Sequence, residues 1–183
     1  MEAKEIKNRS RIVKVKLICG IIFNAGENIK KIESKLTQNF SEIDFKSDII
    51  EFNFTNYYYP EMGKPLKRRF VGFKKLIHPT RLSRIKNDTI ELENKFKQGG
   101  KRKVNIDPGY MEESKFVLAS TKNFSHRIYL NNRIYGEVTL RYEKGNFTNL
   151  PWTFPDYKTN TYKNILKQAR KIYKKQLKKQ RKS

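Results

Sequence analysis

The sequence contains one cysteine and two histidines among its 183 residues. A single cysteine cannot form a disulfide within the chain, and so few soft ligands do not supply a typical structural zinc site. Cys19 lies in an apolar run, where a thiol acts as a small hydrophobic side chain rather than as a nucleophile. We therefore expect no metal site, and the composition leaves the cofactor unknown.

Long hydrophobic runs are also missing. No stretch approaches the roughly 20 apolar residues that a membrane-spanning helix needs. Residues 1–11 are basic and polar, and the short apolar run after them leads into helix-like sequence instead of a small-residue cleavage site. We expect a cytoplasmic protein that is not an integral membrane protein.

Three common motifs are absent. The chain has no G-x-x-x-x-G-K-[ST] phosphate loop, no G-x-G-x-x-G turn and no G-x-S-x-G elbow. These absences argue against P-loop nucleotide hydrolases, Rossmann-type dinucleotide enzymes and α/β-hydrolases.

Acidic residues are scarce: 18 Asp and Glu stand against 41 Lys and Arg, which gives a formal net charge of +23. Two interpretations remain open for the body of the chain, namely a polyanionic partner and the coding bias of an AT-rich genome. The C-terminal segment differs because its charge is concentrated. Its cations are Lys163, Lys167, Arg170, Lys171, Lys174, Lys175, Lys178, Lys179, Arg181 and Lys182, with no acidic residue among them.

The apolar pattern predicts one α+β domain. Residues 12–23 read as a central strand, and Ile29, Ile32, Leu36 and Phe40 then recur at helical spacing. Residues 48–55 and 68–76 read as strands, and the segment between them, residues 57–65, reads as an irregular loop rich in tyrosine. A second helix begins near Pro79 and ends before Gly99. This order predicts a ferredoxin-like β-α-β-β-α opening.

Antiparallel hairpins and a long basic helix are expected to complete the fold. Residues 103–107 read as a strand that ends at a Pro108-Gly109 turn. Residues 115–121, 125–130 and 133–142 read as further strands, and residues 162–182 as the terminal helix. We accordingly divide the chain into a flexible basic arm (1–11), a single α+β domain (12–158) and a docked amphipathic helix (159–183).

Several segments together resemble a bacterial family called domain of unknown function 4416. They are residues 57–63 (YYYPEMG) with Leu66 and Arg69-Phe70, residues 105–110 (NIDPGY), Thr121-Lys122, residues 126–130 (HRIYL), residues 135–140 (YGEVTL) and residues 152–157 (WTFPDY). The resemblance implies a cytoplasmic bacterial protein and supplies no activity. Some members are labelled GTP-binding, but this chain lacks both the phosphate loop and the Asn-Lys-x-Asp motif that such a label requires.

One predicted hairpin carries the candidate chemistry. If Asn131-Asn132 is a two-residue turn, Ile128 pairs with Tyr135, and His126 becomes the cross-strand neighbour of Glu137. A carboxylate beside an imidazole fixes its tautomer, as in acid–base sites. The alternative is an ordinary structural His–Glu pair.

Cations near this pair suggest a phosphate-bearing ligand, either a nucleotide or RNA. Lys122, Arg127 and Arg141 could hold the phosphate, while His126 and Glu137 transfer a proton. Asp107, at a predicted strand end, is a third candidate catalytic residue. Further candidate ligand-binding residues are Tyr58, Glu61 and Arg69 of the tyrosine-rich segment, and Tyr110.

Two other functions remain open. His78-x-Thr80 resembles half of a two-histidine phosphoesterase signature, but the segment after His126 lacks the matching hydroxyl residue. Alternatively, the protein is a non-catalytic RNA- or ribosome-associated protein that uses the terminal helix and the tyrosine-rich segment. The oligomeric state is left open.

Overall fold

The computed structural model describes residues 12–180. The predicted basic arm, together with Arg181 and Lys182, lies outside the described residues. The elements, in chain order, are β1 (Lys16–Asn24), α2 (Ile29–Asn39), β2 (Ile43–Lys46), β3 (Ile50–Glu51), α3 (Tyr59–Met62), β4 (Leu66–Phe73), a 3-10 turn (Pro79–Arg81), α4 (Leu82–Asn94), β5 (Val104–Met111), β6 (Lys115–Ser120), β7 (Ile128–Asn131), β8 (Ile134–Glu143), β9 (Asn146–Asn149) and α5 (Asn160–Gln180).

The described strands form one antiparallel sheet. Its main order is β2-β4-β1-β5-β6-β8-β7, with β3 beside β4 and β9 beside β8. Helix α2 connects β1 to β2, and α4 connects β4 to β5. The predicted α+β class is confirmed, and the ferredoxin-like description of the opening stays a prediction.

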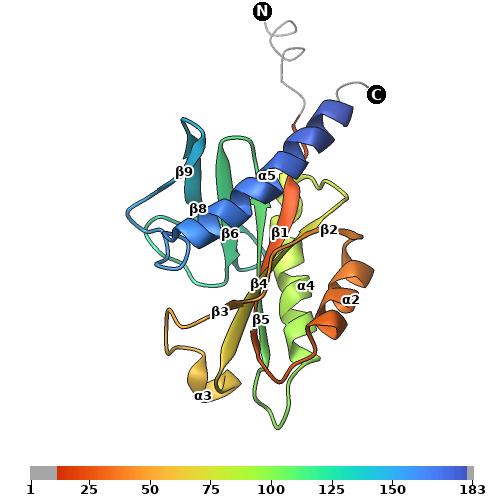
Figure 1. Ribbon diagram of the computed structural model, residues 1–183, viewed down its shortest axis with the longest axis vertical. Coiled ribbons are helices and arrows are strands. Elements are labelled where there is room, and N and C mark those ends of the chain that lie inside the picture. Colours follow the sequence, from red (N-terminus) through yellow and green to blue (C-terminus); the bar gives the residue numbers. More distant parts are fainter. Residues whose placement is uncertain (1–11, 181–183) are drawn as a thin grey trace, which may run out of the picture.

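Helices cover both faces of the sheet (Figure 1). On one face, alternate residues of β1 such as Leu17 and Ile21 pack with Ile32 of α2 and Ile85 of α4. On the opposite face, Ile18 belongs to the cluster beneath α5. Because side chains of a strand alternate between faces, β1 is apolar on both sides and therefore reads as an almost continuous hydrophobic run.

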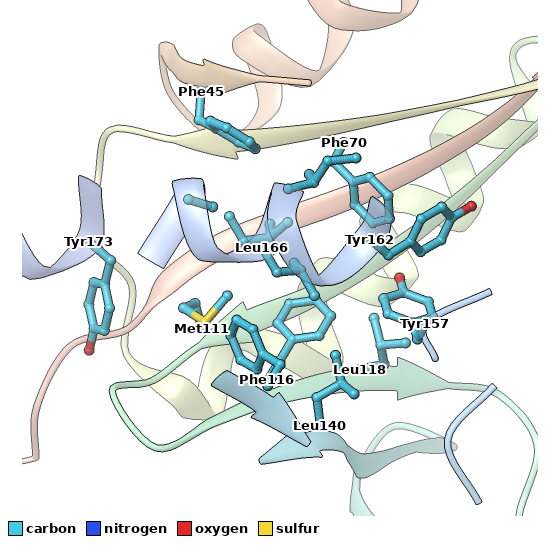
Figure 2. Packing of buried hydrophobic residues seen from close by; sticks show 14 of the residues in the cluster. Phe45, Phe70, Met111, Phe116, Leu118, Leu140, Tyr157, Tyr162, Leu166 and Tyr173 are labelled. Atoms are coloured by element: carbon cyan, nitrogen blue, oxygen red, sulfur yellow. The ribbon is translucent and has the colours of Figure 1, made fainter. Parts of the chain in front are cut away.

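Helix α5 contributes its whole apolar stripe to the core (Figure 2). Tyr162, Leu166 and Tyr173 are buried against Phe70 and Phe116 of the sheet. Tyr162 meets Phe70 edge to face, with ring centroids 4.8 Å apart. The stripe is therefore fully used in packing, which leaves only the polar side of α5 facing outward.

A buried lysine fastens α5 to the sheet. The ammonium of Lys16 on β1 donates to Asp44 at 2.6 Å, to the Phe73 carbonyl at 2.8 Å and to Gln176 of α5 at 3.2 Å. Burial lowers the pKa of Lys16, and the hydrogen bond to Asp44 opposes this effect. All three acceptors satisfy the charge, so the site is structural.

The segment between α2 and β4 differs from the prediction. The expected strand over residues 48–55 is replaced by β2, which lies earlier, and by the two-residue β3. The predicted loop contains α3, a single helical turn. Pro60 is compatible with this turn because proline is tolerated at the start of a helix.

The predicted Pro108-Gly109 turn is wrong, because both residues lie inside β5. Pro108 is paired with Cys19 of β1. A Cβ atom on Gly109 would lie 2.4 Å from the Val117 carbonyl oxygen of β6. Glycine is thus needed here for the close approach of β6, and not for a turn.

Candidate functional site

The site lies where the sheet opens between β5 and β6. These strands pair only from Gly109 to Met111, so the first half of β5 has no strand on this edge. Side chains of α4 take the place of that strand. Glu93 accepts a hydrogen bond from the Ile106 amide at 2.7 Å, and Lys86 donates to the Ile106 carbonyl at 2.9 Å. The backbone groups of Ile106 on this edge are thereby satisfied without a neighbouring strand.

A pocket of about 830 Å³ occupies this opening. Its aromatic wall comprises Phe52, Phe54, Tyr57, Tyr58, Phe154 and Tyr157, its cations are Arg68, Lys86, Lys97, Arg102, Lys122 and Arg127, and its carboxylates are Glu61, Glu93, Asp107, Glu137 and Asp156. The volume falls within the usual range of small-molecule sites. The lining suits a ligand that has a flat ring, an anionic group and hydrogen-bonding groups.

Arg68 of β4 forms part of the pocket lining although it is only 1% exposed. Its guanidinium donates to the Tyr157 hydroxyl at 2.9 Å and lies 3.5 Å from Asp107. The ring of Phe70 packs 4.9 Å from the guanidinium carbon. A Cβ atom on Gly20 of β1 would lie 2.4 Å from the guanidinium, so this group occupies the space that a side chain at Gly20 would take.

Two carboxylates of the pocket lining, Asp107 and Asp156, interact electrostatically with this arginine. Asp107 lies 3.7 Å from the Lys86 ammonium and accepts a hydrogen bond from Asn105 at 2.9 Å. Asp156 accepts the Tyr157 amide at 3.0 Å. Burial raises the pKa of Asp156 above its ordinary value, and the charge of Arg68 opposes this increase. The middle of the pocket thus offers carboxylate acceptors, which suit hydroxyl or amino groups of a ligand.

Replacing Asp156 by asparagine is expected to change how stability depends on pH. The folded state holds the Asp156 proton more tightly than the unfolded chain, so stability falls as pH rises from about 4, the unfolded value, through the raised folded pKa. Asp156→Asn should therefore be more stable than the wild type at pH 8 and equal to it in acid, as measured by urea unfolding. Parallel pH profiles for the two proteins would contradict this expectation.

A second charged cluster closes the end of the pocket nearest α3. Arg102 binds Glu61 at 2.8 Å and Glu93 at 3.4 Å, and it donates to Asn105 at 3.1 Å. The hydrogen bond from Arg102 lowers the pKa of the Glu61 carboxyl. Burial raises the pKa of Glu93. Arg102 thus binds both carboxylates of this cluster, which favours a structural role for this end.

The opposite end carries the pair predicted from the sequence. Glu137, 2% exposed, accepts hydrogen bonds from His126 at 3.0 Å and from Arg127 at 2.7 Å. The imidazole stacks on Trp152 with centroids 5.0 Å apart and 9° between the rings. His126 therefore lies behind Glu137, while Glu137 and Arg127 line the pocket. The proton-transfer role of the pair stays a prediction.

Lys122 stands beside this pair at the pocket wall. Its ammonium lies 3.4 Å from the Tyr57 hydroxyl and 4.7 Å from the centre of the Tyr57 ring. It makes no ion pair with any other residue between 12 and 180. Arg127 donates to the Lys122 carbonyl at 2.9 Å. Two cations and one carboxylate thus give this end an excess of positive charge.

The predicted hairpin register is wrong by one residue. Ile128 pairs with Gly136 and Tyr129 with Tyr135, because the turn is Asn132-Arg133, both with positive φ. His126 precedes β7 and lies in a turn. It still reaches Glu137 because this turn brings its side chain back over β8. The contact was correct, but the strand pairing that predicted it was not.

The other predicted residues divide into two groups. Tyr58, Glu61 and Asp107 line the pocket together with Lys122 and Arg127. The remaining three lie elsewhere: Arg69 binds Glu33 of α2 at 2.8 Å, Tyr110 packs among the clusters on the α4 side, and Arg141 pairs with Glu143 on the surface. These three do not contribute to the site.

Sequence reasoning missed Arg68, Arg102 and Asp156. Arg68 stands in the basic run Lys67-Arg68-Arg69, which reads as a solvated strand end. Strand alternation offers a signal, since Arg68 and Phe70 share a face and Phe70 is a core residue. No local pattern marks Arg102, because its partners come from three separate segments.

Two negative findings apply to the described part of the chain. Residues 12–180 contain no group of three or more His, Cys, Asp or Glu side chains that could hold a metal ion. None of their helices is both long enough and apolar enough to cross a bilayer.

Comparison with known proteins identifies the family. A family model described as "Domain of unknown function (DUF4416)" matches residues 13–173. The chain belongs to this family. No curated protein and no solved structure matches it. The DUF4416 match spans every residue that lines the pocket, and it ends within α5 at Tyr173.

Proposed function

We propose that the protein binds a nucleotide in the pocket between β5 and β6, with the phosphate group near Lys122 and Arg127. The observation that carries this proposal is Lys122, a pocket cation whose neighbour in the wall is the neutral ring of Tyr57. A phosphate oxygen there would gain a charge-assisted hydrogen bond.

The rest of the lining supports a nucleotide over a simple anion. Phe54, Tyr57 and Phe154 are about 40–60% exposed, so their rings are accessible for stacking on a base. Asp107 and Asp156 offer acceptors for sugar hydroxyls or base amino groups. The pocket volume of about 830 Å³ is in the range of small-molecule sites and so favours one nucleotide over a continuous RNA strand.

Calorimetric titration with adenosine, guanosine and their triphosphates tests the proposal. We expect the triphosphates to bind at least about tenfold more tightly than the parent nucleosides, since one charge-assisted hydrogen bond supplies about 1.5–3 kcal/mol. Lys122→Gln should weaken triphosphate binding about tenfold and leave nucleoside binding unchanged.

Lys75→Gln is the matched control. Lys75 is an exposed lysine outside the pocket, so its loss removes the same charge from the protein. Equal weakening of triphosphate binding by both substitutions would mean that binding depends on the overall positive charge of the protein and not on the pocket. Absence of nucleotide binding at low salt would refute the proposal.

A further inference from the structure

Helix α5 presents a stripe of lysines on its outward side. Lys171, Lys174, Lys175 and Lys178 recur at the spacing i, i+3, i+4 and i+7, and all four are exposed. Residues three or four apart are neighbours on a helix surface, so the four ammonium groups share one face. In Figure 1, α5 lies across the outside of the sheet.

These lysines lack acidic partners. None of the four forms an ion pair within the described residues, and α5 itself contains no Asp or Glu. Like charges at i and i+4 repel by a few tenths of a kcal/mol per pair in a helix. An anionic partner would convert this repulsion into attraction.

Two other cations of α5 already have hydrogen-bond partners within the protein. Arg170 donates to the Glu113 carbonyl at 2.7 Å and covers the ring of Tyr142 at 3.5 Å, and Lys167 donates to Asn146. The residues in the first half of the helix thus hold it on β9 and the β5–β6 loop. The stripe of four lies beyond them and is not used in packing.

The packing of α5 decides which polyanion the stripe suits. A helix that lies on a membrane inserts an apolar face among the lipids. Here the apolar stripe, including Leu166, Ala169, Tyr173 and Leu177, is buried against the sheet. None of the exposed large hydrophobic side chains of residues 12–180 belongs to α5. The outer surface of the helix therefore offers charge without an insertion surface.

We propose that the four-lysine stripe of α5 binds the phosphate backbone of a nucleic acid without reading its sequence. Lysine ammonium groups replace the counterions of the backbone, and their release drives binding. The stripe runs about 10 Å along the helix, at about 1.5 Å per residue, which spans several backbone charges. This surface is separate from the pocket and does not depend on nucleotide binding there.

The test compares two quadruple variants of equal net charge. One carries Lys171→Gln, Lys174→Gln, Lys175→Gln and Lys178→Gln. The control carries Lys30→Gln, Lys31→Gln, Lys35→Gln and Lys95→Gln, four exposed lysines of α2 and the end of α4, which cover the other face of the sheet. Fluorescence anisotropy with a labelled 20-base-pair RNA duplex and a DNA duplex of the same length, from about 50 to 200 mM salt, gives affinity and its salt dependence.

We expect the α5 variant to bind at least about tenfold more weakly than the wild type at low salt. The slope of log affinity against log salt should become shallower by about 3 to 4, close to 0.9 for each lost phosphate contact on DNA. The control should retain most of the affinity and slope. Replacing the same four α5 residues by arginine should preserve binding, and the circular dichroism spectrum of the glutamine variant should match that of the wild type, which together exclude a folding defect as the cause. The two duplexes show whether RNA or DNA is preferred.

Three outcomes would overturn the proposal. Equal weakening by the α5 variant and the control would assign the affinity to diffuse basicity. Failure of the wild type to bind either duplex at about 50 mM salt would refute the proposal, because phosphate contacts are strongest at low salt. Stronger binding to vesicles of anionic phospholipid than to either duplex, lost in the same α5 variant, would assign the stripe to a membrane.

Discussion

Replacing Gly20 by alanine is expected to destabilise the protein by about 3 kcal/mol. The added Cβ would lie 2.4 Å from the Arg68 guanidinium, which is 1% exposed and would have to shift toward the pocket that it lines. Its displacement would break the hydrogen bond to Tyr157 and separate Arg68 from Asp107. Urea unfolding monitored by circular dichroism measures the loss.

A double-mutant cycle isolates the cause. In a protein carrying Arg68→Met, the cost of Gly20→Ala should fall below about 1 kcal/mol, because the flexible methionine can give way and alanine is otherwise better than glycine in a strand. Coupling of this size would establish that a side chain at position 20 is costly because the Arg68 guanidinium occupies its space. The same cost in both backgrounds would show that the guanidinium does not need this space.

Removing the Glu137 carboxylate is expected to cost about 3–5 kcal/mol. Glu137→Ala leaves the side chains of His126 and Arg127, which are 13% and 10% exposed, without the acceptor that both of them share. Glu137→Gln retains an acceptor oxygen and should cost less. Thermal and urea unfolding should show that the wild type is the most stable, Glu137→Gln is intermediate and Glu137→Ala is the least stable.

Glu143 on the same strand provides the control for this prediction. It pairs with Arg141 at 3.3 Å, and both side chains are about half exposed. Glu143→Ala should therefore change stability by less than about 0.5 kcal/mol. If Glu137→Ala is equally mild, Glu137 does not anchor this end of the pocket.

Helix α5 packs beside one proposed surface and carries the other. Tyr162, at the start of α5, lies with its ring 5.6 Å from the Arg68 guanidinium carbon, whereas the lysine stripe occupies the later turns. Burial raises the pKa of Tyr162 to about 12, so its hydroxyl stays neutral beside Arg68. Helix α5 thus contacts the pocket residue Arg68 at its start and carries the lysine stripe on its later turns, outside the pocket lining.

The sequence alone determined the class, the family and several elements. Regular spacing of apolar residues such as Ile32 and Leu36 marks α2, because a helix repeats every 3.6 residues whatever it packs against. The quoted segments predicted a family that the match over residues 13–173 confirms. Six pocket residues were also selected from the sequence, because their charged or aromatic side chains suggested ligand contacts or proton transfer.

Local patterns failed where another strand decides the conformation. Pro108-Gly109 has the composition of a turn, yet β1 and β6 hold it in the sheet. The one-residue error around Asn132 arose because several residues of that segment tolerate positive φ, and the pairing with β8 selects between the alternatives. Such choices depend on contacts that are distant in sequence.

For the basic residues, too, the sequence determines one part of the picture and the tertiary structure another. The sequence determined that 41 basic residues are present and that many gather near the C-terminus. Only the tertiary structure decided that the Arg68 guanidinium is buried over Gly20, that Lys16 is buried in an ion pair with Asp44 and that the lysine stripe of α5 is exposed. The physical reason is that the cost of burying a charge depends on partners brought together by the fold, and composition contains no information about them.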